Sequence, residues 1–294
     1  MSDSLEFTGE RFTPECEREI WYEHFHRYAL AARWCAGADV LDAACGEGYG
    51  AALLARSAAS VIGVDISAET VAHAQGRYGT DERLKFQAED CASLPFAADT
   101  FDRVVSFETL EHVAAQEEML SEFKRVLRPG GFLILSSPDK AVYSDQQGFD
   151  NEFHVRELYR DELEALIRRH FPAFRLLGQK LVFHSAIFSL ERARQVTVEQ
   201  SSGDGLSSPP GIGHAPMYFI ALCAADESSL PNIDGRLWLF DDHAESVYEH
   251  YHGEIKRNMA AGGIIAGLER EISQLRRQSS PSRPSWWRRL LKIR

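Results

Sequence analysis

The sequence predicts an α/β fold in which helices cover a doubly wound, mainly parallel sheet. Three observations lead to this fold class. Short apolar runs alternate with segments of helical periodicity between residues 38 and 138. These runs lack the polar alternation of a half-exposed strand, which indicates strands buried on both faces. Helices of about 10–15 residues separate them, which is the spacing of crossover connections between parallel strands.

The first part of the chain is expected to supply these elements in order. Strands are predicted over 38–43, 60–65, 83–90, 101–108 and 132–138. Helices are predicted over 14–34, 49–57, 68–78, 114–126 and 160–170. Residues 128–131, with the sequence RPGG, are typical of a turn. Residues 139–155 are expected to form a loop.

The second part of the chain is less regular. Residues 174–183 and 216–225 are expected to pair as a closing hairpin of the sheet, and the Ser-, Gly- and Pro-rich stretch 199–216 between them predicts a mobile surface loop. From about residue 241 the pattern is helical again. A seam of about two heptads follows: Ala261, Ile265, Leu268, Ile272 and Leu275. Nearby glycines weaken this helix: Gly262, Gly263 and Gly267.

Composition excludes several classes of protein. The net charge is −12 over 294 residues, which disfavours general nucleic-acid binding. The five cysteines are widely spaced and contain no CxxC pair, so we expect buried reduced thiols rather than disulfides or a zinc site. The first residues are polar, without an apolar signal segment, and no apolar run is long enough to cross a bilayer. These features predict a cytoplasmic protein.

The stretch VLDAACGEGYGAALLA, residues 40–55, carries glycines at alternate positions between a predicted strand and a predicted helix: Gly46, Gly48 and Gly50. Glycine permits positive φ and lets a ligand approach the backbone closely. A loop at a helix N-terminus also presents amide N–H groups to a polar ligand. The GxGxG spacing differs from the GxGxxG fingerprint of dinucleotide-binding proteins, so an NAD dehydrogenase is disfavoured.

Acidic residues stand at the ends of the first three predicted strands: Asp42, Asp65 and Asp90. The carboxyl ends of parallel strands meet at one edge of the sheet, so these side chains are expected to line one crevice. A carboxylate such as Asp65 can accept both hydroxyls of a ribose, and Asp90 can accept the exocyclic amine of adenine. The pattern predicts a nucleoside site without a pyrophosphate. A loop or helix cap is the alternative for Asp42.

Five ordered motifs across about residues 39–138 resemble those of class I S-adenosylmethionine-dependent methyltransferases: VLDAACGEGYG, GVDIS, AEDCASLPF, FDRVVSFETLEHV and LRPGGFLILSSP. The resemblance implies S-adenosylmethionine as cofactor and a Rossmann-like sheet of seven strands whose last strand is antiparallel. The chain is expected to comprise four regions: an N-terminal helical lid over 1–36, a methyltransferase domain over 37–226, and, from the residue patterns that follow, a C-terminal helix with a short coiled coil over 227–278 and a basic aromatic tail over 279–294.

The resemblance further implies roles for matching positions. The methionine part of the cofactor would contact the first strand and the glycine loop: Asp42, Ala44, Cys45, Gly46 and Gly48. The nucleoside would contact the ends of the next two strands: Asp65, Ile66, Asp90 and Cys91. Phe107 would lie near the sulfonium. Core packing is the alternative for Phe107 and Leu110, and it is the favoured one for the Cys45 side chain.

Methyl transfer from a sulfonium requires that acceptor, methyl and sulfur be aligned, and a sugar hydroxyl also needs a general base. His154, in the loop after the fifth strand, is our first candidate; its alternative role is to fix that loop. His112 and Glu108 are further candidates after the fourth strand, although the EH pair of related enzymes usually shapes the site floor and caps the next helix. Asp139, Glu152 and His154 match no tight metal motif, so no metal is expected.

The N-terminal stretch carries a second resemblance. FTGERFTPECEREIWYEHFHRYALAA, together with DAACGEGYG and NEFHVRELYRDEL, is similar to methyltransferases encoded beside bacterial surface-polysaccharide and glycosyltransferase genes. Asp139 and Glu152 depart from that family, which often has SxPN and NPFH there. The resemblance implies a lid over the cofactor, with these candidate contacts: Arg11, Tyr22, His26 and Arg27. The alternative is an amphipathic helix that packs its aromatic face into the core: Trp21, Phe25 and Tyr28.

We therefore expect a methyltransferase for a hydroxyl of a nucleotide-linked or lipid-linked saccharide in polysaccharide biosynthesis. A small metabolite such as a quinone or polyketide is the alternative acceptor, and an inactive tethering module is the alternative class. The end SWWRRLLKIR suits contact with an anionic membrane, and the seam before it suits a homodimer. A frayed end, or one that docks on a protein partner, is the alternative. These features predict peripheral contact with the inner face of the membrane.

Overall fold

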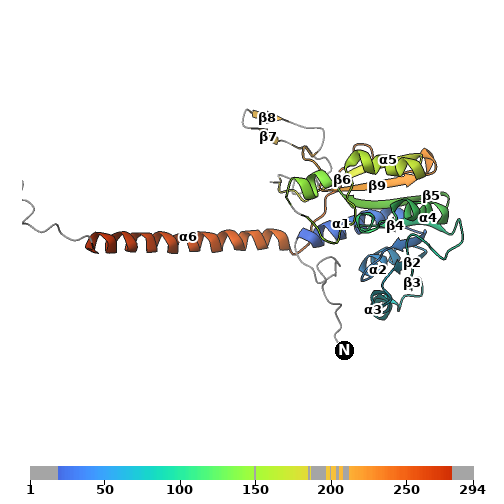
Figure 1. Cartoon of the computed structure of the whole chain (residues 1–294), viewed down its shortest axis with the longest axis horizontal. Coiled ribbons are helices and arrows are strands. Elements are labelled where there is room, and N and C mark those ends of the chain that lie inside the picture. The colour runs from blue at the N-terminus through green and yellow to red at the C-terminus, as the bar shows by residue number, and fades with distance from the viewer. Residues whose placement is uncertain are drawn as a thin grey trace, which may run out of the picture. The chain divides into compact units, whose positions relative to one another are not determined.

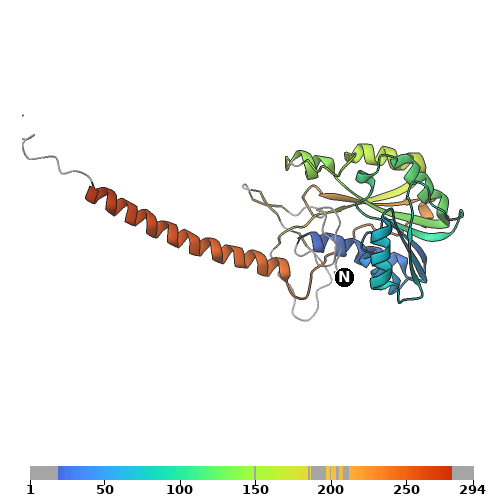
Figure 2. The ribbon, with the colours of Figure 1, turned by 60° about the horizontal axis from the view of Figure 1, so that its bottom comes forward.

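A computed structural model describes residues 19–148, 150–184, 186, 197–198, 200–202, 205–207 and 212–279. The chain divides into two compact units, Met1–Asp241 and Asp242–Arg294. The first unit contains a seven-stranded sheet with helices on both faces (Figure 1, Figure 2). The predictions for Arg11, for Cys16 and for the tail after residue 279 lie outside the described residues.

The strands of the sheet follow one another in the order β3 (Leu84–Ala88), β2 (Ser60–Asp65), β1 (Asp39–Ala43), β4 (Phe101–Ser106), β5 (Leu127–Pro138), β9 (Tyr218–Ala224) and β6 (Ala173–Gln179). The strands from β3 to β5 pair in parallel, whereas β9 is antiparallel to both of its neighbours. This confirms the predicted sheet. The chain reverses its direction across the sheet between β1 and β4, which is where open α/β sheets bind ligands.

Helices on the two faces bury two separate apolar clusters. α1 (Glu19–Cys35), α2 (Tyr49–Ala55) and α3 (Ala68–Tyr78) cover one face; α4 (Gln116–Val126) and α5 (Arg160–His170) cover the other. The amphipathic pattern explains the packing of α4, because Met119, Leu120 and Phe123 share one side of the helix and are all fully buried. The Ser67 side chain accepts a hydrogen bond from the Thr70 amide and so begins α3.

α1 packs its aromatic side chains into the core, as the alternative to a lid expects. Tyr28 is buried, Trp21 stacks on Phe25 with ring centroids 4.3 Å apart, and Phe25 stacks on Tyr49 at 5.1 Å. A lid formed by the N-terminal region remains a prediction.

Three segments differ from the sequence-based expectation. The predicted turn over 128–131 lies inside β5, because a register shift opposite Phe101 and Arg103, with Gly130 at a φ of 84°, forms a bulge that lets pairing continue. The predicted loop after β5 contains a helical turn, η2 (Ala141–Asp145). Within the predicted surface loop, β7 (Gln200–Ser202) and β8 (Gly205–Ser207) pair as an antiparallel hairpin.

The second unit contains the helix α6 (Ser246–Ser279), which is 34 residues long and runs through the three glycines. Its seam residues Ile265, Leu268 and Ile272 are exposed. The segment before it, with η3 (Glu227–Ser229), belongs to the first unit, where Trp238 lies edge-on to Trp34 with ring centroids 6.1 Å apart. None of the helices in the described ranges combines the length and the hydropathy needed to span a membrane.

Candidate functional site

The three glycines after β1 are required for different structural reasons. A Cβ atom on Gly46, whose φ is 54°, would meet no other atom within 4 Å. A Cβ on Gly48 would lie 2.8 Å from Ala74 and 2.9 Å from Phe86, and a Cβ on Gly50 would lie 2.0 Å from the Tyr28 ring. Packing of α1, α3 and β3 therefore explains Gly48 and Gly50. Of the three, Gly46 is the glycine that leaves open space beside the backbone.

The end of β2 presents a carboxylate that the backbone holds in place. The two oxygens of Asp65 accept hydrogen bonds from the Gly46 amide at 3.0 Å and from the Ser67 amide at 2.9 Å. The neighbouring Ile66 side chain is 77% exposed, which is unusual for a large aliphatic group. The structure thus places an oriented carboxylate and an uncovered apolar surface beside the open glycine.

The end of β3 contributes the next predicted pair. Asp90 is exposed, and one of its oxygens accepts a hydrogen bond from the Ala92 amide at 2.8 Å. The Cys91 thiol is buried, and burial raises its pKa to about 12. The thiols of Cys35, Cys45 and Cys223 are also free and buried, as predicted for reduced cysteines. Burial raises the pKa of each of these thiols, which favours the unreactive protonated form.

Asp42 at the end of β1 faces α1 rather than solvent. It is fully buried and accepts a hydrogen bond from the Tyr28 hydroxyl at 3.0 Å. Burial raises the pKa of this carboxyl to about 7, and the hydrogen bond from Tyr28 opposes that rise. In this arrangement Asp42 ties the end of β1 to α1 through a side-chain hydrogen bond.

Glu47, between Gly46 and Gly48, was not predicted from the sequence to have a role. It is almost completely buried and accepts hydrogen bonds from Arg77 at 2.9 Å, from the Tyr78 hydroxyl at 3.0 Å and from the ring of His73 at 3.2 Å. These partners anchor the loop to α3. The sequence around Glu47 did not predict this role, because its hydrogen-bond partners lie 26 to 31 residues further along the chain.

A second group of polar side chains lies beyond the end of β4. Glu108 has a φ of 49°, a conformation that costs a non-glycine residue about 1–2 kcal/mol. Ser136 of β5 holds it on both sides, because the Ser136 hydroxyl donates to the Glu108 carboxylate at 2.5 Å and accepts from the Glu108 amide at 3.1 Å. Strain retained by surrounding contacts is typical of functional positions.

Arg27 of α1 completes this polar group. Its guanidinium is 1% exposed, donates to Gln179 at 2.8 Å, and lies 3.8 Å from the Glu108 carboxylate and 4.9 Å from the Tyr218 ring centroid. Burial raises the pKa of Glu23 to about 7, and the positive charge of Arg27 opposes that rise. Arg27 therefore lies by the ends of β4 and β6 and the start of β9, and its contact with the cofactor stays a prediction.

His154 has both ring nitrogens engaged. Nδ1 lies 2.5 Å from the Glu157 carboxylate, and Nε2 lies 3.0 Å from the amide nitrogen of Asn151. The Asn151 side-chain oxygen accepts from the Phe153 amide, which orients its NH2 group toward the ring. The ring also stacks on Tyr143, with centroids 5.4 Å apart. These contacts fit the alternative role, fixing the loop, better than the role of general base.

His112, in the turn η1 (Leu110–His112), lies edge-on to His154 with ring centroids 4.8 Å apart. Its Nδ1 donates to the Phe153 carbonyl at 3.0 Å. Glu111 beside it is 1% exposed, and neither carboxylate oxygen has a hydrogen-bond partner among the described residues. Burial raises the pKa of Glu111 well above its usual value, and the negative charge of Glu108 adds to the rise.

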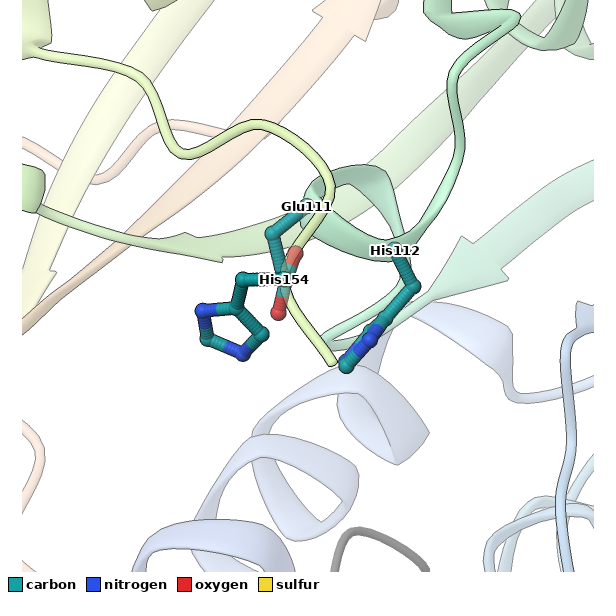
Figure 3. A group of neighbouring side chains, drawn as sticks. All are labelled: Glu111, His112 and His154. Atoms are coloured by element: carbon teal, nitrogen blue, oxygen red, sulfur yellow. The ribbon is translucent and has the colours of Figure 1, made fainter. Parts of the chain in front are cut away.

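Figure 3 shows Glu111, His112 and His154 converging. Their potential ligand atoms all lie within 4.8 Å of one another. Within the described ranges this is the one group of at least three His, Cys, Asp or Glu residues arranged in this way. Asp139 and Glu152, considered with His154 in the sequence, do not belong to it; the Asp139 carboxylate accepts from the Ala141 amide at 3.1 Å instead.

Comparison with known proteins places the chain in a family. Residues 41–135 match a family model described as a methyltransferase domain. Over 189 residues the chain is 39% identical to a protein of Mycolicibacterium smegmatis named probable S-adenosylmethionine-dependent methyltransferase, and the match covers 63% of this chain and 72% of that relative. The chain belongs to the S-adenosylmethionine-dependent methyltransferases.

Two further proteins are similar to this methyltransferase. A demethylmenaquinone methyltransferase of Beutenbergia cavernae is 32% identical over 198 residues, which is 59% of this chain and 80% of that relative. The solved structure of the YcgJ protein of Bacillus subtilis matches with a TM-score of 0.50 and 20% identity, over 69% of this chain and all of the other. At that identity the second likeness establishes the shared fold alone.

The chemistry of the residues at the ends of β1, β2 and β3 suits the cofactor of a methyltransferase. S-adenosylmethionine supplies a methyl group on a positively charged sulfur, and it carries an amino-acid part, a ribose and an adenine. Gly46 leaves backbone room, Asp65 presents a fixed carboxylate and Ile66 an uncovered apolar surface.

Proposed function

We propose that the methyltransferase transfers the methyl group to a hydroxyl of a saccharide carried by a nucleotide or a lipid. The polar group beyond β4 is the observation that supports this acceptor. The Glu108 carboxylate accepts a hydrogen bond from the Ser136 hydroxyl and lies 3.8 Å from the Arg27 guanidinium, so a carboxylate, a hydroxyl and a guanidinium form one polar cluster. The Glu108 side chain is 16% exposed, and a carboxylate oxygen has a second lone pair, so Glu108 can accept a further hydrogen bond from a sugar hydroxyl.

The cofactor, on this proposal, lies along the ends of β1, β2 and β3. Each Asp65 oxygen accepts one backbone amide, and a carboxylate oxygen has a second lone pair, so Asp65 retains acceptor sites for the ribose hydroxyls. Ile66 packs on the adenine, and Asp90 with the Cys91 backbone accepts at its edge. Phe107, beyond β4, lies near the sulfonium. The backbone of the glycine loop, with Asp42 behind it, holds the methionine part of the cofactor through these residues: Ala44, Cys45, Gly46 and Gly48.

Glu108 is the general base on this proposal. It stands at the end of β4, next to the switch point between β1 and β4, and its side chain is 16% exposed. The Ser136 hydroxyl and the nearby Arg27 fix the orientation of the carboxylate. His154 and His112 are secondary candidates, because His154 has both nitrogens engaged by protein groups and His112 is held by the Phe153 carbonyl.

A quinone is the second candidate acceptor. The relative named demethylmenaquinone methyltransferase favours it, and so do Tyr143 and Tyr218, whose ring centroids lie 6.0 Å apart beside the polar group. A planar acceptor would stack on such rings, whereas a sugar would use the carboxylate and guanidinium.

We also propose that the C-terminal unit brings two copies of the enzyme to an anionic membrane. The exposed seam of α6 supports a homodimer, and the basic, tryptophan-containing sequence after residue 279 supports peripheral contact with lipid. This arrangement would concentrate the enzyme near lipid-linked glycans, in keeping with a role in polysaccharide biosynthesis.

The test is methyl transfer from radiolabelled S-adenosylmethionine to a panel of nucleotide sugars, lipid-linked glycans and demethylated quinones. We expect label in a saccharide and a turnover about 100-fold lower in Glu108→Gln, with cofactor affinity unchanged. Glu164→Gln, on α5, where the carboxylate likewise pairs with arginine side chains, is the matched control and should behave as wild type. Label in the quinone alone would replace the proposed acceptor.

The membrane proposal has its own test. Removing residues 281–294 should reduce sedimentation with vesicles of anionic lipid and leave activity on a soluble acceptor unchanged. Equal sedimentation of the truncated and full-length chains would exclude lipid contact through the tail. Analytical ultracentrifugation of the full chain and of an Ile272→Asp variant should separate dimer from monomer.

A further inference from the structure

Glu111 is the most conspicuous polar side chain that the proposed reaction does not use. It is 1% exposed, and neither of its oxygens has a hydrogen-bond partner among the described residues. A buried carboxylate without a partner is strongly unfavourable, so such groups usually face a cation or a ligand. Glu111 lies with two imidazoles in the group that Figure 3 shows.

The two histidines are oriented as metal ligands usually are. The Nδ1 of His154 faces the Glu157 carboxylate at 2.5 Å, and the Nδ1 of His112 donates to the Phe153 carbonyl at 3.0 Å. In both rings this assigns the proton to Nδ1 and the lone pair to Nε2. Histidine ligands characteristically donate their second nitrogen to a carboxylate or a backbone carbonyl. Ser144 in turn donates to the other Glu157 oxygen, which holds this outer layer in place.

The spacing permits one ion between the three side chains. Their potential ligand atoms all lie within 4.8 Å of one another. Around an ion with bonds of about 2.1 Å the ligand atoms are about 3.4 Å apart, so the side chains need to close by about 1–2 Å. The Asn151 amide, now 3.0 Å from the Nε2 of His154, would give way to the ion.

We propose that Glu111, His112 and His154 bind a divalent transition-metal ion. Two imidazoles and one carboxylate suit zinc, cobalt, manganese or iron(II), whereas magnesium and calcium prefer oxygen ligands throughout. Three protein ligands leave a coordination position for a further oxygen. If the proposed sugar acceptor is correct, its hydroxyl takes that position, and the ion lowers the hydroxyl pKa so that Glu108 can remove the proton.

Cobalt(II) titration of the full chain, without any histidine tag, methyl donor or acceptor, tests the site directly. Visible absorption and calorimetry should report one ion per chain. Glu111→Gln and His154→Asn should each weaken binding by at least about 100-fold, and Glu157→Gln, one layer out, by about 10- to 100-fold. His170→Asn is the matched control, because His170 also pairs with a carboxylate, Glu117, at 2.6 Å, but on α5. It should bind as wild type does.

Thermal unfolding provides a readout that does not depend on spectroscopy. Cobalt should raise the melting temperature of the wild type and of His170→Asn but not of Glu111→Gln. Absence of saturable cobalt binding, or equal binding by wild type and Glu111→Gln, would overturn the proposal. The cobalt titration contains no acceptor, so its result does not depend on whether the enzyme methylates a saccharide. Likewise, absence of cobalt binding would not decide whether a saccharide is methylated.

Discussion

Replacing Asp42 with asparagine should change how the stability of the enzyme depends on pH. The carboxyl is fully buried, and its pKa rises from 3.8 to about 7 in the folded chain. The folded state therefore holds a proton that the unfolded state has lost between these two values. Because the folded state binds more protons in this window, the free energy of unfolding falls as pH rises through it.

The magnitude follows from that shift. A change from 3.8 to about 7 corresponds to about 4 kcal/mol of lost stability once pH is above both values. About 2 kcal/mol of this is already lost near pH 5, so the wild type should lose about 2–3 kcal/mol more than the variant between about pH 5 and about pH 8.5. Asparagine can still accept from Tyr28, but its buried NH2 group costs about 1–3 kcal/mol. The net gain at high pH is therefore about 1–3 kcal/mol.

Urea unfolding at the two pH values, followed by circular dichroism, checks this prediction. The difference in the free energy of unfolding between wild type and Asp42→Asn is measured at high pH and at low pH, and the two differences are compared. Raised pKa values elsewhere in the chain, such as that of Glu23, are common to both proteins and cancel. Asp161→Asn, at an exposed position of α5, serves as control. Parallel pH profiles for wild type and Asp42→Asn would refute the argument from burial.

Three further changes have expected outcomes. Asp65→Ala should weaken S-adenosylmethionine binding by about 1–3 kcal/mol in calorimetry, and an unchanged dissociation constant would remove Asp65 from the cofactor site. Gly50→Ala should lower the melting temperature, because its Cβ would lie 2.0 Å from the Tyr28 ring. Gly76→Ala should instead stabilise α3 by about 0.5–1 kcal/mol, because its Cβ would meet no atom within 4 Å. Equal effects of the two substitutions on the melting temperature would contradict the packing explanation. Glu47→Ala should lower the free energy of unfolding by about 1–3 kcal/mol, measured with urea, because it removes the hydrogen bonds that Arg77, Tyr78 and His73 make to a buried carboxylate; an unchanged free energy of unfolding would show that the loop is anchored otherwise.

Local patterns determined most of the fold. α3 and α5 begin and end at the residues that the sequence predicts, because apolar periodicity and terminal residues act within a few positions of the chain. The bulge in β5 was not predicted, because it depends on pairing with another strand and not on the local sequence. RPGG is typical of a turn, and only pairing with β4 shows that the strand continues through it.

The residues proposed to hold the cofactor were also largely identifiable from the sequence. Strand ends, the glycine loop and Asp65 follow one another within about 50 residues, and parallel pairing brings consecutive strand ends to one edge. Only the tertiary structure distinguished Gly46, which faces open space, from Gly48 and Gly50, which face other side chains. That distinction depends on which side chains arrive from α1, α3 and β3.

The group of side chains proposed to bind the acceptor is brought together only by the tertiary structure. Arg27 and Gln179 are 152 residues apart in the chain, and they meet because β6 joins the sheet beyond β9. Glu111 and His154 converge because the loop after β5 folds back on the turn after β4, where the Val155 amide donates to the Glu111 carbonyl at 2.8 Å. Periodicity and capping act over a few residues, whereas strand register and loop contacts bring together positions with no local pattern in common.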